Sequence, residues 1–237
     1  MLSDLRNYVV RSKREEVPGV VTLLLSEESG GVPAFIAGQY INVYFPETRT
    51  PEGKAYSISN APGESEFSLT VRAIGEFSNR LCNLAIGDKV TASLPYGFFT
   101  PEKEESELVM LAAGIGVAPF RSIIRDAAAR APRRPMALFH SVRTSSDAIF
   151  QKEFENLREK LPSFSLAYFI TREESPAIPD ALPQRMTADD ILPRILNLDN
   201  AEFLICGSIS FTRDLWRTLR KAGVSEDKMY TEAFFSH

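Results

Sequence analysis

Cysteine and histidine are scarce in this chain, with two residues of each among 237. The two cysteines, Cys82 and Cys206, are too few for a disulfide framework or for an iron–sulfur cluster held by four thiolates. No group of histidine, cysteine and carboxylate residues has the spacing of a metal site, so no bound metal is expected. Cys82 is expected to pack in the core. His140, in an apolar segment, is expected to be a core residue with satisfied hydrogen bonds.

Long apolar runs and a strong excess of one charge are also lacking. The first residues, MLSDLRNYVV, contain no apolar run long enough for a signal peptide, and no segment approaches the roughly 20 apolar residues of a membrane span. A net charge of −4 provides no general basic surface for nucleic acid. The hydrophobic share of 44% and charged share of 24% are typical of globular proteins. These features together predict a cytoplasmic protein with reduced thiols.

Short segments rich in β-branched and aromatic residues fill the first half of the chain, and turn sequences such as Ser29-Gly30-Gly31 separate them. Several of these segments alternate apolar and polar residues, as strands with one buried face do. The pattern predicts an antiparallel β-barrel or sandwich, interrupted by one helical piece near 78–84. The predicted strands are 19–25, 39–45, 54–60, 66–73 and 88–94.

In the second half, apolar strands alternate with helices, which predicts an α/β doubly wound parallel sheet with helices on both faces. The charged segment 101–107 is interpreted as a solvated linker, and the chain therefore divides into domains 1–101 and 102–237. The predicted strands are 108–114, 136–142, 165–171 and 202–208. One predicted helix ends near Arg130, and the others lie near 148–160, 188–198 and 211–222.

A glycine turn, Gly114-Ile115-Gly116-Val117-Ala118-Pro119, directly follows the first strand of this second half. Glycines at a strand-to-helix turn let the backbone approach a pyrophosphate, and the helix start presents free N–H groups to it. Pro119 suits the first helical turn, where its missing N–H costs nothing. Because the third glycine of the usual dinucleotide fingerprint is absent, a tight packing turn is the alternative interpretation.

The next strand ends in His140-Ser141-Val142-Arg143, with no acidic residue to hold a ribose 2′-hydroxyl. The Ser141 hydroxyl and the Arg143 guanidinium suit a 2′-phosphate, which arginine binds through two parallel hydrogen bonds. Arg172, at the end of the following strand, adds positive charge. This arrangement favours NADP over NAD, and the alternative is that both arginines are ordinary solvated loop residues.

Four separated motifs, in order along nearly the whole chain, resemble those of the ferredoxin–NADP reductase superfamily. This resemblance implies an FAD-binding barrel followed by an NAD(P)-binding domain. It also implies hydride transfer between nicotinamide and flavin. The motifs are Lys54-Ala55-Tyr56-Ser57, Gly75-Glu76-Phe77-Ser78, the turn from Gly114 to Pro119, and Cys206-Gly207-Ser208 together with the C-terminal segment 230–235.

The resemblance implies that the first two motifs hold FAD. Tyr56 offers a flat ring to the flavin, and Ser57 a hydroxyl. Ser78 combines an N-capping hydroxyl with helix N–H groups for the pyrophosphate. Lys54 stands where the family has arginine, so the phosphate contact should be less directional and the flavin more exchangeable. The predicted flavin-binding residues are Lys54, Ala55, Tyr56, Ser57, Val71, Arg72, Gly75, Phe77 and Ser78.

The remaining motifs are expected to serve the nicotinamide dinucleotide. Cys206 is expected to pack beside the nicotinamide ring and align it rather than act as a nucleophile, and Glu232 to stabilise developing charge or pass protons. Phe234 and Phe235 are expected to cover the flavin face that nicotinamide must reach. Cys206, Glu232 and Ser57 form the predicted catalytic set. The predicted dinucleotide-binding residues are Gly114, Gly116, Val117, Pro119, Ser141, Arg143, Arg172, Cys206, Gly207 and Phe234.

The function implied by the resemblance is a flavoprotein oxidoreductase that exchanges hydride between NADP(H) or NAD(H) and bound FAD. Its electrons would pass to a separate acceptor such as a ferredoxin or flavodoxin. Because the chain has only two cysteines, an iron–sulfur centre would have to lie on another chain or on an extension. One alternative is an FAD-binding electron-transfer subunit of a larger complex. Another is an enzyme that takes free flavin as substrate.

Overall fold

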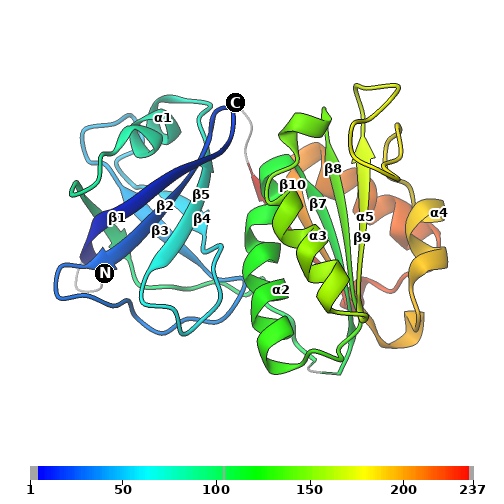
Figure 1. Cartoon of the computed structure of the whole chain (residues 1–237). Coiled ribbons are helices and arrows are strands. Elements are labelled where there is room, and N and C mark those ends of the chain that lie inside the picture. Colours follow the sequence, from blue (N-terminus) through cyan, green and yellow to red (C-terminus); the bar gives the residue numbers. More distant parts are fainter. Residues whose placement is uncertain (1–4, 104, 235–237) are drawn as a thin grey trace. The chain divides into compact units, whose positions relative to one another are not determined.

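A computed structural model describes residues 5–103 and 105–234, which form two compact units. The first unit contains the residues up to Thr100 together with Ala118–Asp126. The second contains the described residues of 101–117 and those from Ala127 onward (Figure 1). The division after Thr100 lies one residue from the sequence-based boundary, but a helical segment from later in the chain belongs to the first unit. No helix among the described residues is long and apolar enough to cross a bilayer.

The first unit is built on a six-stranded antiparallel sheet in the order β4-β3-β6-β1-β2-β5. An antiparallel bridge between Ile58 and Leu69 joins the two edge strands and closes the sheet into a barrel. The strands are β1 (Leu5–Val17), β2 (Val20–Glu27), β3 (Tyr40–Tyr44), β4 (Lys54–Ser57), β5 (Phe67–Arg72) and β6 (Lys89–Ser93). The helix α1 (Glu76–Asn83) follows β5.

The barrel core contains the apolar residues predicted by alternation, and Tyr8 packs against Phe67 with the ring centroids 5.5 Å apart. Cys82 lies in this core, as predicted. Strand β1 was not predicted from the sequence, because its second half is the charged tract Arg11–Glu16, which resembles a loop in composition. That tract is a strand because it pairs with β2 along its length. Pairing with the neighbouring strand therefore outweighed local composition.

The helix α2 (Ala118–Arg130) contributes its first nine residues to the first unit. Within that unit, the buried Arg121 guanidinium donates to the Ser59 carbonyl at 3.0 Å. The Ser122 hydroxyl donates to the Asn60 carbonyl at 2.6 Å. Ser59 and Asn60 lie in the segment after β4, and these bonds satisfy backbone acceptors of buried residues.

The second unit contains a five-stranded parallel sheet in the order β11-β10-β7-β8-β9. The doubly wound prediction is confirmed: α4 and α5 lie on one side of the sheet and α3 on the other (Figure 1). The elements, besides the 3-10 turns, are β7 (Glu107–Ala113), β8 (Met136–Val142), α3 (Gln151–Lys160), β9 (Phe164–Ile170), α4 (Ala188–Ile191), β10 (Ala201–Ser208), α5 (Ile209–Lys221) and β11 (Met229–Phe234).

Two of these elements differ from expectation. The helix predicted near 188–198 is only one turn of α-helix, because Pro193 follows in a 3-10 turn and cannot donate to the helical ladder. The edge strand β11 was not predicted as a strand. The exposure of its side chains alternates along the strand, and it contains no long apolar run that would have predicted a buried strand. It forms through parallel pairing with β10.

The segment 101–107 is not the fully solvated linker that the sequence suggested, because Ser106 and Glu107 are buried. Ser106 lies in a polar cluster around the buried Glu202 carboxylate. That carboxylate accepts hydrogen bonds from the Ser106 hydroxyl and the Glu102 backbone N–H, and pairs with Arg134 at 3.3 Å. Burying a carboxylate is tolerated when such partners replace water. The cluster ties the start of β7 to the start of β10.

Replacing Glu202 with alanine is expected to lower the free energy of unfolding by about 3–5 kcal/mol, because it leaves Arg134 buried without its carboxylate. Glu226→Ala, which removes an exposed carboxylate from an ion pair with Arg220, should cost less than about 1 kcal/mol. Urea denaturation followed by circular dichroism measures both. Equal losses for the two variants would refute the role given to the buried cluster.

Candidate functional site

The first group of predicted site residues surrounds the phenyl ring of Phe77 in the barrel unit. The Tyr56 ring stacks on this ring at 6.2 Å between centroids, with 21° between the planes. The Lys54 ammonium lies 5.9 Å from the Phe77 centroid. Phe77 is almost fully buried, whereas Tyr56 and Lys54 are half-buried and retain exposed surface. Burial raises the pKa of the Tyr56 hydroxyl, so it remains protonated and able to donate at neutral pH.

The start of α1 adjoins this group, and its capping differs from the sequence-based interpretation. Gly75, not Ser78, is the N-cap residue. Ser78 occupies the third helical position, where its hydroxyl accepts from the backbone N–H groups of Ile74 at 3.0 Å and Gly75 at 3.1 Å. The Ser78 hydroxyl therefore holds the loop before the helix. A pyrophosphate would be bound by the first-turn N–H groups, which have no partner within the helix.

The other predicted flavin residues take different positions on the same unit. Ser57 is buried opposite Tyr40 on β3, while Ala55 is exposed. The Val71 side chain lies in the barrel core, so only its backbone is available to a ligand. Arg72 is half-buried at the end of β5.

A flavin dinucleotide fits the residues of this unit. The half-buried Tyr56 ring provides a flat apolar surface, and the Lys54 ammonium provides positive charge for a phosphate. Around Gly75, a side chain would meet no atom within 4 Å, so the helix start is open to a bulky anion. The Lys54–Phe77 contact was not predicted from sequence, because a cation lying over an aromatic ring leaves no local pattern.

In the second unit, the glycine turn begins at the carboxyl end of β7, and its two glycines have different roles. Gly114 has φ of +52°, a left-handed conformation that favours glycine, and the space around it is open. A Cβ on Gly116 would lie 2.3 Å from the Cys206 carbonyl oxygen, so this glycine permits close packing on β10. Both interpretations of the turn thus have support, one at each glycine. Val117 caps α2, and Pro119 lies in its first turn.

The same close packing recurs at Gly207, where a Cβ would lie 2.8 Å from the Ala113 Cβ. Its neighbour Cys206 is fully buried, so its contact with a nicotinamide ring remains a prediction. Burial raises the pKa of the Cys206 thiol well above its ordinary value, and the Glu232 carboxylate raises it further. A neutral, buried thiol is a poor nucleophile, in agreement with a packing role.

Strand β11 places the C-terminal residues of the predicted site beside β10. Glu232 pairs in register with Cys206, and Phe234 with Ser208. Both side chains are half-buried. Phe235 lies outside the described residues.

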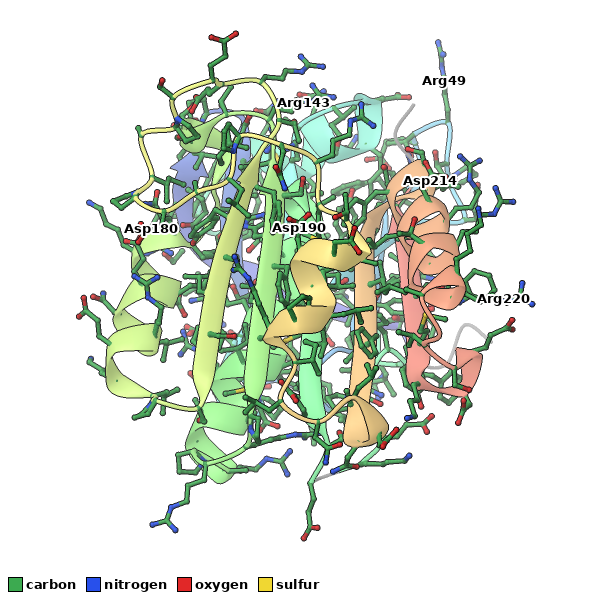
Figure 2. The ribbon with its side chains drawn as sticks, turned by 90° about the vertical axis from the view of Figure 1, so that its right-hand side faces the viewer. Arg49, Arg143, Asp180, Asp190, Asp214 and Arg220 are labelled. Atoms are coloured by element: carbon green, nitrogen blue, oxygen red, sulfur yellow. The ribbon has the colours of Figure 1, made fainter. Side chains whose placement is uncertain are left out.

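Arg143 and Arg172 are exposed and lie next to each other just beyond β8 and β9, because the Arg172 backbone N–H donates to the Arg143 carbonyl at 2.8 Å. Figure 2 shows Arg143 at the upper end of the sheet, where β8 ends. Ser141 is half-buried opposite Ala113, at the start of the glycine turn. The structure therefore brings the predicted ribose-phosphate residues to the carboxyl edge of the sheet, where ligands bind in such folds.

An acidic residue also lies at this edge, and it was not predicted from the sequence. The Glu173 carboxylate accepts hydrogen bonds from the Ser145 backbone N–H at 3.0 Å and from the Ser145 hydroxyl. Because these bonds hold the carboxylate on the loop after β8, it is less available to a ribose hydroxyl. A glutamate that directly follows Arg172 was visible in the sequence, but its partner was not. Among the described residues, no cluster of three or more histidine, cysteine or acidic residues could hold a metal ion.

Residues 110–216 match the family model of the oxidoreductase NAD-binding domain. The chain is 25% identical to a flavohemoprotein of Bacillus subtilis, over 98% of this chain and 59% of that protein. It is 26% identical to the toluate 1,2-dioxygenase electron transfer component of Pseudomonas putida, over 95% of this chain and 66% of that protein. The chain thus spans about 60% of the length of these curated relatives.

Solved structures agree with these sequence matches. The FAD/NAD-binding domain of a Vibrio cholerae nitric oxide dioxygenase superposes with a TM-score of 0.87 at 25% identity, covering 98% of this chain and 99% of that one. A ferredoxin–NADP+ reductase from Neisseria gonorrhoeae, solved with bound FAD and NADP, superposes with a TM-score of 0.80 at 25% identity. That match covers 98% of this chain and all of the other. Both relatives share the fold over their whole length.

The two thiols are expected to be nearly inert in the folded protein. Burial raises the pKa of both Cys82 and Cys206, so at pH 8 each has less reactive thiolate than a free cysteine. Labelling with an aromatic disulfide reagent at pH 8 should therefore be slow in buffer and rapid for both thiols in denaturant. A Cys82→Ser variant assigns any residual reactivity. Fast labelling of Cys206 in the folded protein would contradict its burial.

Proposed function

Because the chain belongs to the ferredoxin–NADP reductase superfamily, whose members use FAD and NAD(P)H, we propose that it is an NAD(P)H-dependent flavin oxidoreductase. Electrons would pass from a nicotinamide dinucleotide through bound FAD to an acceptor on a separate chain. The observation that carries this proposal is the group formed by Lys54, Tyr56 and Phe77 at the start of α1. The group combines an aromatic surface, a cation and free helix N–H groups within one unit.

Different residues of the barrel unit bind different parts of FAD. Tyr56 stacks against the flavin, while Lys54 and the first-turn N–H groups of α1 bind its phosphates. Ser57 and Arg72 supply further polar contacts. Because lysine has no planar fork, it orients a phosphate less strictly than arginine does, and FAD is expected to exchange readily. When bound, FAD supplies the hydride and electron-transfer chemistry that these side chains lack.

The second unit is proposed to bind the nicotinamide dinucleotide at the carboxyl edge of its sheet. The Gly114 turn receives the pyrophosphate, and Cys206 and Gly207 form the wall behind the nicotinamide. Glu232, beside Cys206 in the register of β10 and β11, stabilises positive charge that develops on the ring. Phe234 covers an apolar part of the site. Arg143, Arg172 and Ser141 favour the 2′-phosphate of NADP.

The acceptor is proposed to be a ferredoxin or a flavodoxin. The chain has only two cysteines, so a four-thiolate cluster would have to lie on another polypeptide or on an extension of this one. Use of a nicotinamide dinucleotide, together with two unbridged thiols, favours a cytoplasmic location. The second candidate is an electron-transfer subunit of a larger redox complex. It is favoured by the observation that the chain matches only part of a flavohemoprotein and of a dioxygenase electron transfer component.

The test of this function is the absorbance of the purified protein, with FAD added if necessary, under anaerobic conditions. We expect a yellow protein whose flavin absorbance near 450 nm bleaches on addition of NADPH or NADH. A yellow protein that neither nucleotide bleaches, but that a reduced partner does, would support the subunit instead. A protein that binds no FAD even when the flavin is supplied would refute both functions.

Replacing both Arg143 and Arg172 with alanine is expected to remove most of any preference for NADPH over NADH, because both exposed cations lie at the proposed 2′-phosphate site. The measurement is the ratio of kcat/KM for the two nucleotides. Arg133→Ala combined with Arg194→Ala, at two exposed arginines elsewhere on the second unit, is the matched control and should leave the ratio unchanged. An intact preference in the first double variant would exclude the 2′-phosphate site.

A further inference from the structure

A buried histidine lies next to the glycine turn, and its chemistry is not used by the function proposed above. His140 is fully buried in β8, where its neighbours in register are Ala112 on β7 and Tyr168 on β9. The His140 and Tyr168 rings are 5.9 Å apart and tilted. A polar ring in this position needs a hydrogen bond, since burying an imidazole without one is costly.

One such bond reaches the turn directly. The His140 Nε2 atom lies 3.0 Å from the carbonyl oxygen of Gly114. Because a carbonyl oxygen only accepts, Nε2 must carry the hydrogen and donate it. The bond therefore links the side chain of β8 to the first residue of the turn that follows β7.

Gly114 depends on such a bond more than its neighbours do. Its φ of +52° is one of several conformations open to glycine, and no atom lies within 4 Å of where its Cβ would be. Gly116, by contrast, is wedged against the Cys206 backbone. The far end of the turn is thus held by packing, whereas the near end is held by a hydrogen bond.

We propose that His140 is a positioning residue that keeps the Gly114 turn in the conformation that receives the dinucleotide pyrophosphate. The inference rests on the proposed function, because it concerns the same site. It assigns His140 no contact with the ligand and no proton transfer. Without the Nε2–H donor, the turn samples other conformations. Binding must then order the turn, and the entropy lost in ordering it lowers the affinity.

The experiment measures the dissociation constants of NADP+ and NAD+ by titration calorimetry on the FAD-loaded protein. His140→Leu removes the donor and should raise the dissociation constant of the preferred nucleotide about three- to tenfold, the effect of one hydrogen bond. His140→Gln, whose amide retains an N–H donor, should restore binding to within about twofold of wild type. His140→Asn, whose shorter amide does not reach Gly114, replaces His140→Leu if the latter does not fold.

A matched control and a second readout separate positioning from general damage. Tyr168→Phe alters the ring beside His140 without touching the Gly114 bond, and should leave the dissociation constant within about twofold of wild type. The limiting rate of anaerobic flavin reduction at saturating nucleotide, and the FAD content, should stay near wild type in His140→Leu. A structural defect would lower these quantities together with the affinity, and glutamine would not repair it.

Each outcome decides the inference. Weakened binding in His140→Leu, rescued by glutamine and absent in Tyr168→Phe, supports it. Wild-type affinity in His140→Leu, or equal losses in the leucine and glutamine variants, overturns it while leaving the proposed function intact. A wild-type protein that binds neither nucleotide overturns both.

Discussion

The approach of the glycine turn to β10 is the constraint on which the second unit's candidate site depends. Gly116 lies so close to the Cys206 carbonyl that no side chain fits between them, and Gly207 approaches Ala113 in the same way. These two contacts bring the ends of β7 and β10 together at the carboxyl edge of the sheet. Every other predicted dinucleotide residue of this unit is placed relative to that edge. Without it, the glycine turn would not pack on the backbone of the strand that carries the buried thiol.

Hydrogen bonds from side chains, in addition to close packing, fix the loops beside the candidate sites. His140 holds the near end of the turn, Ser78 holds the loop before α1, and Glu173 is held by Ser145. In each case a polar side chain bonds to backbone or to another polar side chain near a candidate binding site. Such bonds reduce the conformational freedom that binding would otherwise have to remove. Each unit thus has a loop beside a candidate site that a side-chain hydrogen bond holds.

Much of the fold could be predicted because its signals are local. The apolar runs of β7, β8, β9 and β10 are typical of parallel strands buried on both faces, and they were placed to within about one residue. The barrel strands β2 to β6 followed from alternation and turn residues. By contrast, β1 and β11 depend on pairing with β2, β6 and β10, and their composition alone does not distinguish them from loops.

The sequence by itself determined the order of the two units, the glycine turn, the lysine in place of the family's arginine and the scarcity of cysteine. Each is a matter of residue identity or of short-range spacing. Only the tertiary structure decided that Gly75 caps α1 in place of Ser78, that Glu202 is buried with Arg134, and that His140 donates to Gly114. The reason is physical. A hydrogen bond or a close contact depends on atoms that the fold brings together, often from residues far apart along the chain. The residue types around each partner do not indicate the distance between the two partners.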